Sequence, residues 1–175
     1  VQGRSKKLYI NYRTSQQIKE TADKVNEFLL ELSDDPHENR RSISIFSGPQ
    51  PVVELFGDRD MEMKNLGYWV QTHLNNGIQP HEIIVISPHH LALNAASNEL
   101  NAAGIKCWKL DSSANYLNGE IGLAVVRRVK GLEYRSVAII GCDEDQFPNA
   151  TKMNELGDGS DFDEFLILEK NALYV

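Results

Sequence analysis

The amino-acid sequence predicts an α/β fold in three layers, with a mostly parallel β-sheet flanked by helices. Short apolar segments of strand length alternate along the chain with longer segments in which apolar residues recur at helical spacing. The segment 83–86 is a continuous β-branched run, which is typical of a strand buried on both faces, and the strand segments lack polar alternation. The chain has 175 residues, of which 41% are hydrophobic, and this length is sufficient for one domain with a sizeable core.

A strand and an amphipathic helix are predicted at the start of the chain. Residues 8–10 have strand character, and Thr14 followed by Gln17 has the pattern of a capping box at a helix start. Apolar residues then recur at helical spacing, and the helix is expected to end near Ser33. The polar stretch 34–41 contains a proline and predicts a loop.

Further strands and helices alternate along the rest of the chain, with no internal linker. Gly77 is expected to end one helix in a left-handed conformation, and Gly104 is expected to close the next. Helices are predicted at 58–75, 89–103 and 163–174. Strands are predicted at 52–56, 83–86, 106–110, 122–126 and 136–140, and the segment 43–46 is either a short strand or part of the loop before it.

Charge is distributed unevenly along the sequence. The formal net charge of −7 argues against nucleic-acid binding by charge alone, and the segment 143–169 is strongly acidic. Basic residues nevertheless gather at Arg4, Lys6, Lys7 and Arg13, and again at Arg127, Arg128, Lys130 and Arg135. The distribution is therefore compatible with a basic patch on an acidic domain.

Composition also bears on location and on metals. No apolar run approaches the roughly 20 residues that cross a bilayer, and the polar, basic N-terminal segment lacks a secretory signal. Cys107 and Cys142 have no CxxC spacing, which favours buried thiols in a reducing cytoplasm over a disulfide. The five histidines show no metal-ligand spacing beyond one adjacent pair. We therefore expect a cytoplasmic protein without a metal site or a membrane partner.

A strand, a basic turn and a second strand follow one another at 125–140. Within the turn, Gly131 would let the backbone approach a ligand closely. Glu133 would offer an acceptor-only carboxylate, which suits sugar hydroxyls. A solvated surface turn is the alternative interpretation of the same residues.

Three segments of the chain resemble motifs of the UvrD/Rep-like superfamily 1 helicases. The segment 130–134, followed by an apolar strand, is similar to motif V, and the segment 10–15, followed by Ile18, is similar to motif IV. The segment 169–175 resembles the opening of motif VI. The motifs occur in the family's order and span nearly the whole chain. The resemblance implies that residues 1–175 are a second RecA-like motor domain, truncated within motif VI before its arginine.

The resemblance also implies roles at an ATP site. In the family, the motif IV arginine reaches the γ-phosphate of ATP, and that position is Arg13, the candidate catalytic residue. A guanidinium suits this role because its phosphate contacts are bidentate and permanently charged. Tyr12 would stack or pack near the nucleotide. Glu133 matches the glutamate that the family uses at the ribose, and Gly131 matches the glycine beside it.

Basic residues around motif V are the candidate nucleic-acid contacts, namely Arg127, Arg128 and Lys130. Val125 and Arg127 stand where the family has a threonine and a histidine that touch single-stranded DNA or relay its presence to the ATP site. Valine lacks the hydroxyl, whereas arginine adds a charge that binds phosphate. Arg128 could equally be a solvated surface charge, and Lys130 could merely hold the turn.

The resemblance implies a fragment of an ATP-dependent DNA helicase or translocase. The chain has no G-x-x-x-x-G-K-[ST] segment, so the fragment alone is not expected to hydrolyse ATP. ATP and Mg²⁺ would bind with the first RecA-like domain of the same protein, and single-stranded or partly duplex DNA is the expected partner. Only a short stretch separates 110 from 122, so the large subdomain that many relatives insert there is expected to be absent.

Two other interpretations stay open. The changes at Val125 and Arg127 would suit a motor-derived ATPase that acts on a protein–nucleic acid complex, such as one with RNA polymerase, without unwinding. A free-standing α/β binding module unrelated to helicases would explain the alternating pattern alone, because a fold does not specify a function.

Overall fold

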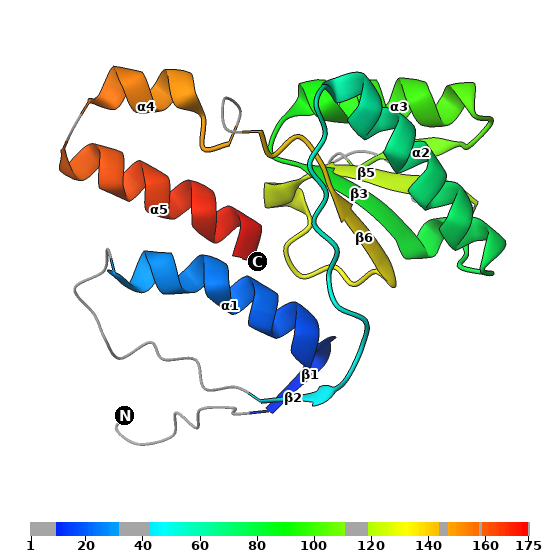
Figure 1. Cartoon of the computed structure of the whole chain (residues 1–175), viewed down its shortest axis with the longest axis horizontal. Coiled ribbons are helices and arrows are strands. Elements are labelled where there is room, and N and C mark those ends of the chain that lie inside the picture. Colours follow the sequence, from blue (N-terminus) through cyan, green and yellow to red (C-terminus); the bar gives the residue numbers. More distant parts are fainter. Residues whose placement is uncertain (1–9, 32–42, 111–118, 144–146, 158, 175) are drawn as a thin grey trace. The chain divides into compact units, whose positions relative to one another are not determined.

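The computed structural model describes residues 10–31, 43–110, 119–143, 147–157 and 159–174. They belong to two compact units, which are considered separately (Figure 1). The first unit comprises residues 1–54 and 158–175, and the second comprises residues 55–157. Each unit holds a parallel sheet and helices, so the predicted α/β class with parallel strands is confirmed.

In the first unit, two parallel strands are combined with two helices. Strand β1 (Ile10–Ser15) pairs with β2 (Ile43–Phe46). Helix α1 (Gln16–Glu31) follows β1 directly, contacts both strands, and packs against α5 (Ser160–Tyr174) (Figure 1). A two-stranded sheet is marginal by itself, so the bonds that join these strands to α1 carry much of the local order.

The two faces of the β1–β2 sheet differ in polarity. Ile10 pairs with Ile43, and Asn11 pairs with Ser44. Because side chains alternate along a strand, Asn11 and Ser44 share one face, and Ser44 is buried there. The opposite face carries Ile10, Tyr12, Ile43 and Ile45, which are 45–68% exposed. The polar face is therefore the one that is packed.

The second unit contains a four-stranded parallel sheet in the order β4-β5-β3-β6. Its strands are β3 (Ile83–Ser87), β4 (Cys107–Lys109), β5 (Ile121–Val125) and β6 (Ser136–Ile139). All five residues of β3 are buried, as the β-branched run predicts for a central strand. The order of the strands makes β4 and β6 the edges of this sheet.

Two helices cover one face of the four-stranded sheet. Helix α2 (Arg59–Asn75) begins at the N-cap Asp58, whose side chain accepts a hydrogen bond from Met61 N at 2.8 Å, and α3 (His90–Ala102) lies beside it. The core that they form contains Met63, Leu66, Val70, Ile83, Val85, Leu93, Ala96, Leu100, Ile121 and Leu123. Within the described residues, no helix combines the length and apolar character needed to cross a membrane.

The connections that follow β3 and β5 run in opposite directions across the sheet. Helix α3 carries the chain from β3 past β5 to β4, and residues 126–135 carry it from β5 past β3 to β6. Because parallel crossovers are right-handed, two connections with opposite directions cross opposite faces. The carboxyl ends of β3 and β5 therefore form a topological switch point, the usual ligand site of open α/β sheets.

Several predicted elements differ from the structure. Thr14 does not cap α1, because it lies in β1 and Ser15 Oγ instead accepts a hydrogen bond from Ile18 N at 3.3 Å. The segment 52–56 is not a strand. Its Val52, Val53 and Leu55 are 80–95% exposed, so β-branched composition without a pairing partner was not sufficient. Helix α4 (Ala150–Leu156) was not predicted, and the predicted loop 34–41 lies outside the described residues.

A close junction holds the carboxyl end of β6 against both helices. Gly141 has a φ of 65°, and its N–H donates a hydrogen bond to Glu62 Oε1 in α2 at 2.8 Å. A Cβ at this position would lie 2.8 Å from Ala92 Cβ in α3 and 3.2 Å from Ser87 Oγ. Only glycine therefore fits this junction without a shift of the backbone.

We expect Gly141→Ala to destabilise the protein by about 3 kcal/mol or more, because left-handed strain and crowding add together. Gly131→Ala is the matched control, because Gly131 has a φ of 88° but open space around its Cβ position. Gly131→Ala should lower the free energy of unfolding only by the backbone strain of about 1–2 kcal/mol. Urea unfolding measures the free energy of unfolding of both variants, and an equal loss in the two would contradict the crowding at Gly141.

Candidate functional site

The junction between β1 and α1 carries the motif IV residues. Tyr12 and Arg13 lie within β1, four and three residues before α1 begins at Gln16. Tyr12 is exposed. Ser15 caps the helix through the bond to Ile18 N, so the chain passes from an extended to a helical conformation immediately after these residues.

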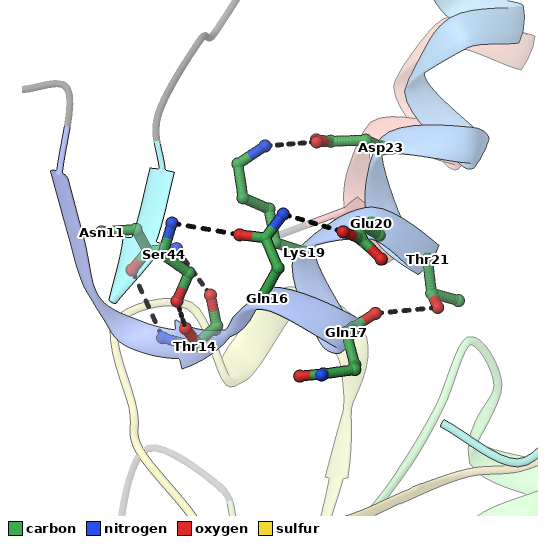
Figure 2. A network of polar contacts seen from close by, with 9 residues as sticks. All are labelled: Asn11, Thr14, Gln16, Gln17, Lys19, Glu20, Thr21, Asp23 and Ser44. Carbon is green, nitrogen blue, oxygen red and sulfur yellow. Dashed lines mark hydrogen bonds and ion pairs between the residues drawn. The ribbon is translucent and has the colours of Figure 1, made fainter. Parts of the chain in front are cut away.

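Polar side chains fix the backbone of this junction (Figure 2). Asn11 Nδ2 donates to Thr14 Oγ1 at 2.6 Å, and Thr14 N donates to Asn11 Oδ1 at 3.3 Å. From β2, the Ser44 hydroxyl donates to the carbonyl oxygen of Thr14, while Ser44 N donates to Gln16 Oε1 at 3.3 Å. Thr14 and Gln16 are thus structural residues that connect the strand, the neighbouring strand and the helix.

Gln17 extends the same network beyond the end of β2. Its Oε1 accepts a hydrogen bond from Gly48 N at 2.8 Å, and its Nε2 donates to Ser47 Oγ at 3.0 Å. Along the helix, Thr21 Oγ1 donates to the Gln17 carbonyl oxygen at 3.0 Å (Figure 2). The sequence interpretation gave Gln17 a capping role, whereas the structure uses its side chain to hold the turn after β2.

The motif V residues follow β5 in the second unit. A short 3-10 turn, η2 (Val126–Arg128), begins at the carboxyl end of β5, and Arg127 and Arg128 are exposed there. Lys130, Gly131 and Glu133 follow on the crossover to β6 and are also exposed. Beyond its chain neighbours, no atom of the described residues lies within 4 Å of the place that a Cβ on Gly131 would take, and the close approach of a ligand there stays a prediction.

The crossover carries basic residues at both ends of the sheet. Arg127 and Arg128 lie at the carboxyl end of β5, whereas Arg135 N donates to Glu82 O, just before β3, at 3.0 Å.

Two histidines at the switch point were not chosen from the sequence. Ser87 pairs with Val125 in register, so the residues after β3 and after β5 start side by side. His89 and His90 follow β3, and His89 N donates to Ser87 Oγ at 3.2 Å. The signal that identifies this position is the order of the strands, which composition and spacing do not reveal.

The candidate residues fall into two separate groups. Tyr12 and Arg13 belong to the first unit, and the motif V residues belong to the second. The motif VI segment continues α5 in the first unit, where Glu169 is buried, with 7% of its surface exposed. The structure thus places the segments resembling motifs IV and VI in the same unit.

The acidic loop after β6 is tied to α2 by charge. Asp143 forms an ion pair with Arg59 at 3.6 Å. Burial, with the carboxylates of Glu62 and Asp143 nearby, raises the pKa of the Cys142 thiol to about 11. Burial and Glu120 likewise raise the pKa of Cys107 to about 11. Among the described residues, no three His, Cys, Asp or Glu side chains gather as metal ligands would.

We expect alkylation of Cys142 to report on this loop, because only the thiolate is nucleophilic. In a Cys107→Ser background, the rate of alkylation should rise through about pH 11 rather than 9.0. Glu62→Gln keeps an acceptor for Gly141 N but removes a negative charge, so the profile should move to lower pH. Asp60→Asn, in the same first turn of α2, is the control and should leave the profile unchanged. An unshifted profile in Glu62→Gln would contradict this arrangement.

No protein-family model matches the chain, and a search of curated proteins finds no match. The assignment of a function therefore rests on the site residues and on their placement in the fold.

Proposed function

We propose that this chain is the second RecA-like motor domain of an ATP-driven nucleic-acid translocase of the UvrD/Rep type. The observation that carries the proposal is the basic η2 turn at the carboxyl end of β5, beside the end of β3. That position is a topological switch point, and the turn begins the segment that resembles motif V. A strand–helix junction that resembles motif IV supports the proposal from the first unit.

The first part of the proposed activity is recognition of ATP. Arg13 contacts the γ-phosphate from this domain, where a guanidinium stabilises the charge that develops during phosphoryl transfer. Tyr12 presents an exposed ring near the nucleotide, and Glu133 accepts hydrogen bonds from the ribose. The phosphate-binding loop and the Mg²⁺ ligands come from the first motor domain, so hydrolysis requires both domains.

The second part is contact with a nucleic-acid backbone. Arg127 and Arg128 project from exposed positions on η2 and bind phosphates, which needs no sequence specificity. His89 and His90 border the same end of the sheet and extend this surface by hydrogen-bond donors. Lys130 adds a third positive charge on the crossover. Closure of the two motor domains around ATP would then move the strand along this surface.

A specific observation favours a motor that does not unwind as the second candidate. Val125 occupies the position of the family's threonine, and its side chain packs against the hydrophobic core of the second unit. An apolar side chain in this position supplies no hydroxyl to the nucleic acid, and Arg127 replaces a histidine with a permanent charge. Such a motor would translocate, or remodel a protein–nucleic acid complex, with altered coupling between nucleic acid and ATP. Unwinding of a bare DNA duplex by the full-length protein would reject this candidate.

We expect Arg13→Ala in the full-length protein to lower kcat for DNA-stimulated ATP hydrolysis by about 100-fold or more. Arg13→Lys should recover little, because an ammonium cannot replace a bidentate guanidinium. Steady-state ATPase kinetics measure both variants, with circular dichroism to verify that they are folded. Near-parental turnover in Arg13→Ala would reject the ATP site proposed for this domain.

We expect Arg127→Ala to weaken binding of single-stranded DNA and to reduce the salt dependence of log K by about one unit, because one phosphate contact is lost. Arg135→Ala is the matched control. It removes the same charge from the same crossover, but at the amino end of the sheet beside Glu82. Fluorescence anisotropy across a salt series measures both. Equal effects of the two variants would mean that net charge, and not the switch point, governs binding.

A further inference from the structure

We propose that Gln17 is a positioning residue that sets the placement of Arg13 for the γ-phosphate. This inference rests on the proposed function, in which Arg13 contacts ATP. Gln17 lies in the first turn of α1, four residues after Arg13, and its side chain bonds away from the helix to the Ser47–Gly48 turn. It therefore connects the segment that carries Arg13 to a part of the chain about thirty residues later.

The Gln17 amide makes two hydrogen bonds, to Ser47 and to Gly48, which together are called the clamp. The carbonyl oxygen accepts from the backbone N–H of Gly48 at 2.8 Å, and the amide nitrogen donates to Ser47 Oγ at 3.0 Å. The oxygen and the nitrogen of the planar Gln17 amide are thus hydrogen-bonded to two adjacent residues. Two bonds to neighbouring residues fix the rotation of the amide, as well as its distance from the turn.

A close contact on the other side of the junction supports the same role. A Cβ on Gly48 would lie 3.0 Å from Ser15 Cβ and 3.2 Å from Ser15 Oγ. Ser15 is the last residue of β1 and the N-cap of α1. The turn that Gln17 holds is therefore packed directly against the point where the strand becomes the helix.

The neighbouring structure makes this clamp important for β1. The sheet of the first unit has two strands, so β1 has a hydrogen-bonded neighbour only in β2 among the described residues. The register between them shifts between Asn11 and Ser15, which is the interval that contains Tyr12 and Arg13. Regular ladder bonds do not span this interval, so side-chain bonds must define its course. Ser44, within β2, bonds to the Thr14 carbonyl oxygen (Figure 2), and the Gln17 side chain bonds to Ser47 and Gly48 just after β2.

Recognition of the γ-phosphate depends on this placement. A bidentate contact demands that the guanidinium be held within about 0.5 Å of its productive position. ADP lacks the γ-phosphate, so misplacement of Arg13 should weaken binding of ATP and leave binding of ADP unchanged. The ratio of the two dissociation constants therefore reports on positioning, whereas general loss of folded protein alters both together.

The test measures this ratio in the full-length protein, with ADP and the non-hydrolysable β,γ-imido analogue of ATP as probes. Gln17→Met keeps the length of the side chain and removes both hydrogen bonds. We expect it to lower the preference for the ATP analogue over ADP about tenfold, a change of the same sign as that expected for Arg13→Ala. Ser47→Ala removes one of the two bonds and should have a smaller effect. Thr21→Val is the matched control, because it removes a hydrogen bond to the Gln17 carbonyl without touching the clamp.

A double mutant separates positioning from a merely structural role. If Gln17 acts through Arg13, Gln17→Met should change the ratio little further in an Arg13→Ala background, whereas independent effects would add. Gly48→Ala disturbs the same turn from the side of Ser15 and should lower the ratio as well, which keeps the test valid if Gln17→Met folds poorly.

The outcomes distinguish this inference from the proposed function. If Arg13→Ala leaves the ratio unchanged, the γ-phosphate role of Arg13 fails, and the role of Gln17 fails with it. If Arg13→Ala abolishes the preference while Gln17→Met and Gly48→Ala leave it at the parental value, only the positioning role is overturned. Additive effects in the double mutant would also overturn it.

Discussion

The burial of β3 is the constraint on which the second unit depends. Every residue of this strand is buried, and parallel strands pair with it on both sides. A strand buried in this way needs cover on both faces. Helices α2 and α3 cover one face, and the right-handed rule for parallel crossovers leads us to expect residues 126–135 along the opposite face. The switch point follows from these two connections, so the position of the basic turn results from how the sheet is covered.

In the second unit, the backbone determines where the site lies, and the side chains determine its charge. The ends of β3 and β5 are aligned by the ladder, with Ser87 opposite Val125, and this alignment is insensitive to surface substitutions. Arg127 and Arg128 then add charge to a place that the strand order has already defined. In the first unit, backbone pairing determines less of the geometry, because the β1–β2 ladder shifts its register where Tyr12 and Arg13 lie. There the amides and hydroxyls of α1 and β2 determine the course of the backbone.

Sequence patterns predicted most of the second unit because its strands and helices have strong local signals. The apolar run at 83–86 matches β3 closely, and Asp58 begins α2 as an N-cap of the expected kind. The failures occur where non-local pairing decides the outcome. Thr14 has the chemistry of a helix cap. However, its carbonyl oxygen accepts a hydrogen bond from the Ser44 hydroxyl and its own hydroxyl accepts one from Asn11 Nδ2, which keeps it in the strand. The segment 52–56 has strand composition, but it pairs with no strand of the part of the chain that the structure describes.

The candidate site was predictable to the extent that it depends on residue type. Gly131 is left-handed and open, and the exposed Arg127 and Arg128 lie at a strand end, as the pattern of strand, basic turn and strand suggested. The positions of His89 and His90 could not be predicted in this way, because β3 and β5 are neighbours only through the order β4-β5-β3-β6.

The two units also differ in how much they can tolerate change at their sites. In the second unit, Gly141 is enclosed by Ala92 and Ser87, so errors in the position of β6 are resisted by close packing. In the first unit, the apolar face of the β1–β2 sheet is exposed, and packing of that face cannot hold the strands. Hydrogen bonds between side chains and backbone are more directional than apolar contacts, so they can fix an orientation where packing is sparse. The polar bonds around Thr14 and Gln17 are therefore the features of the first unit that can fix the course of the backbone at Arg13.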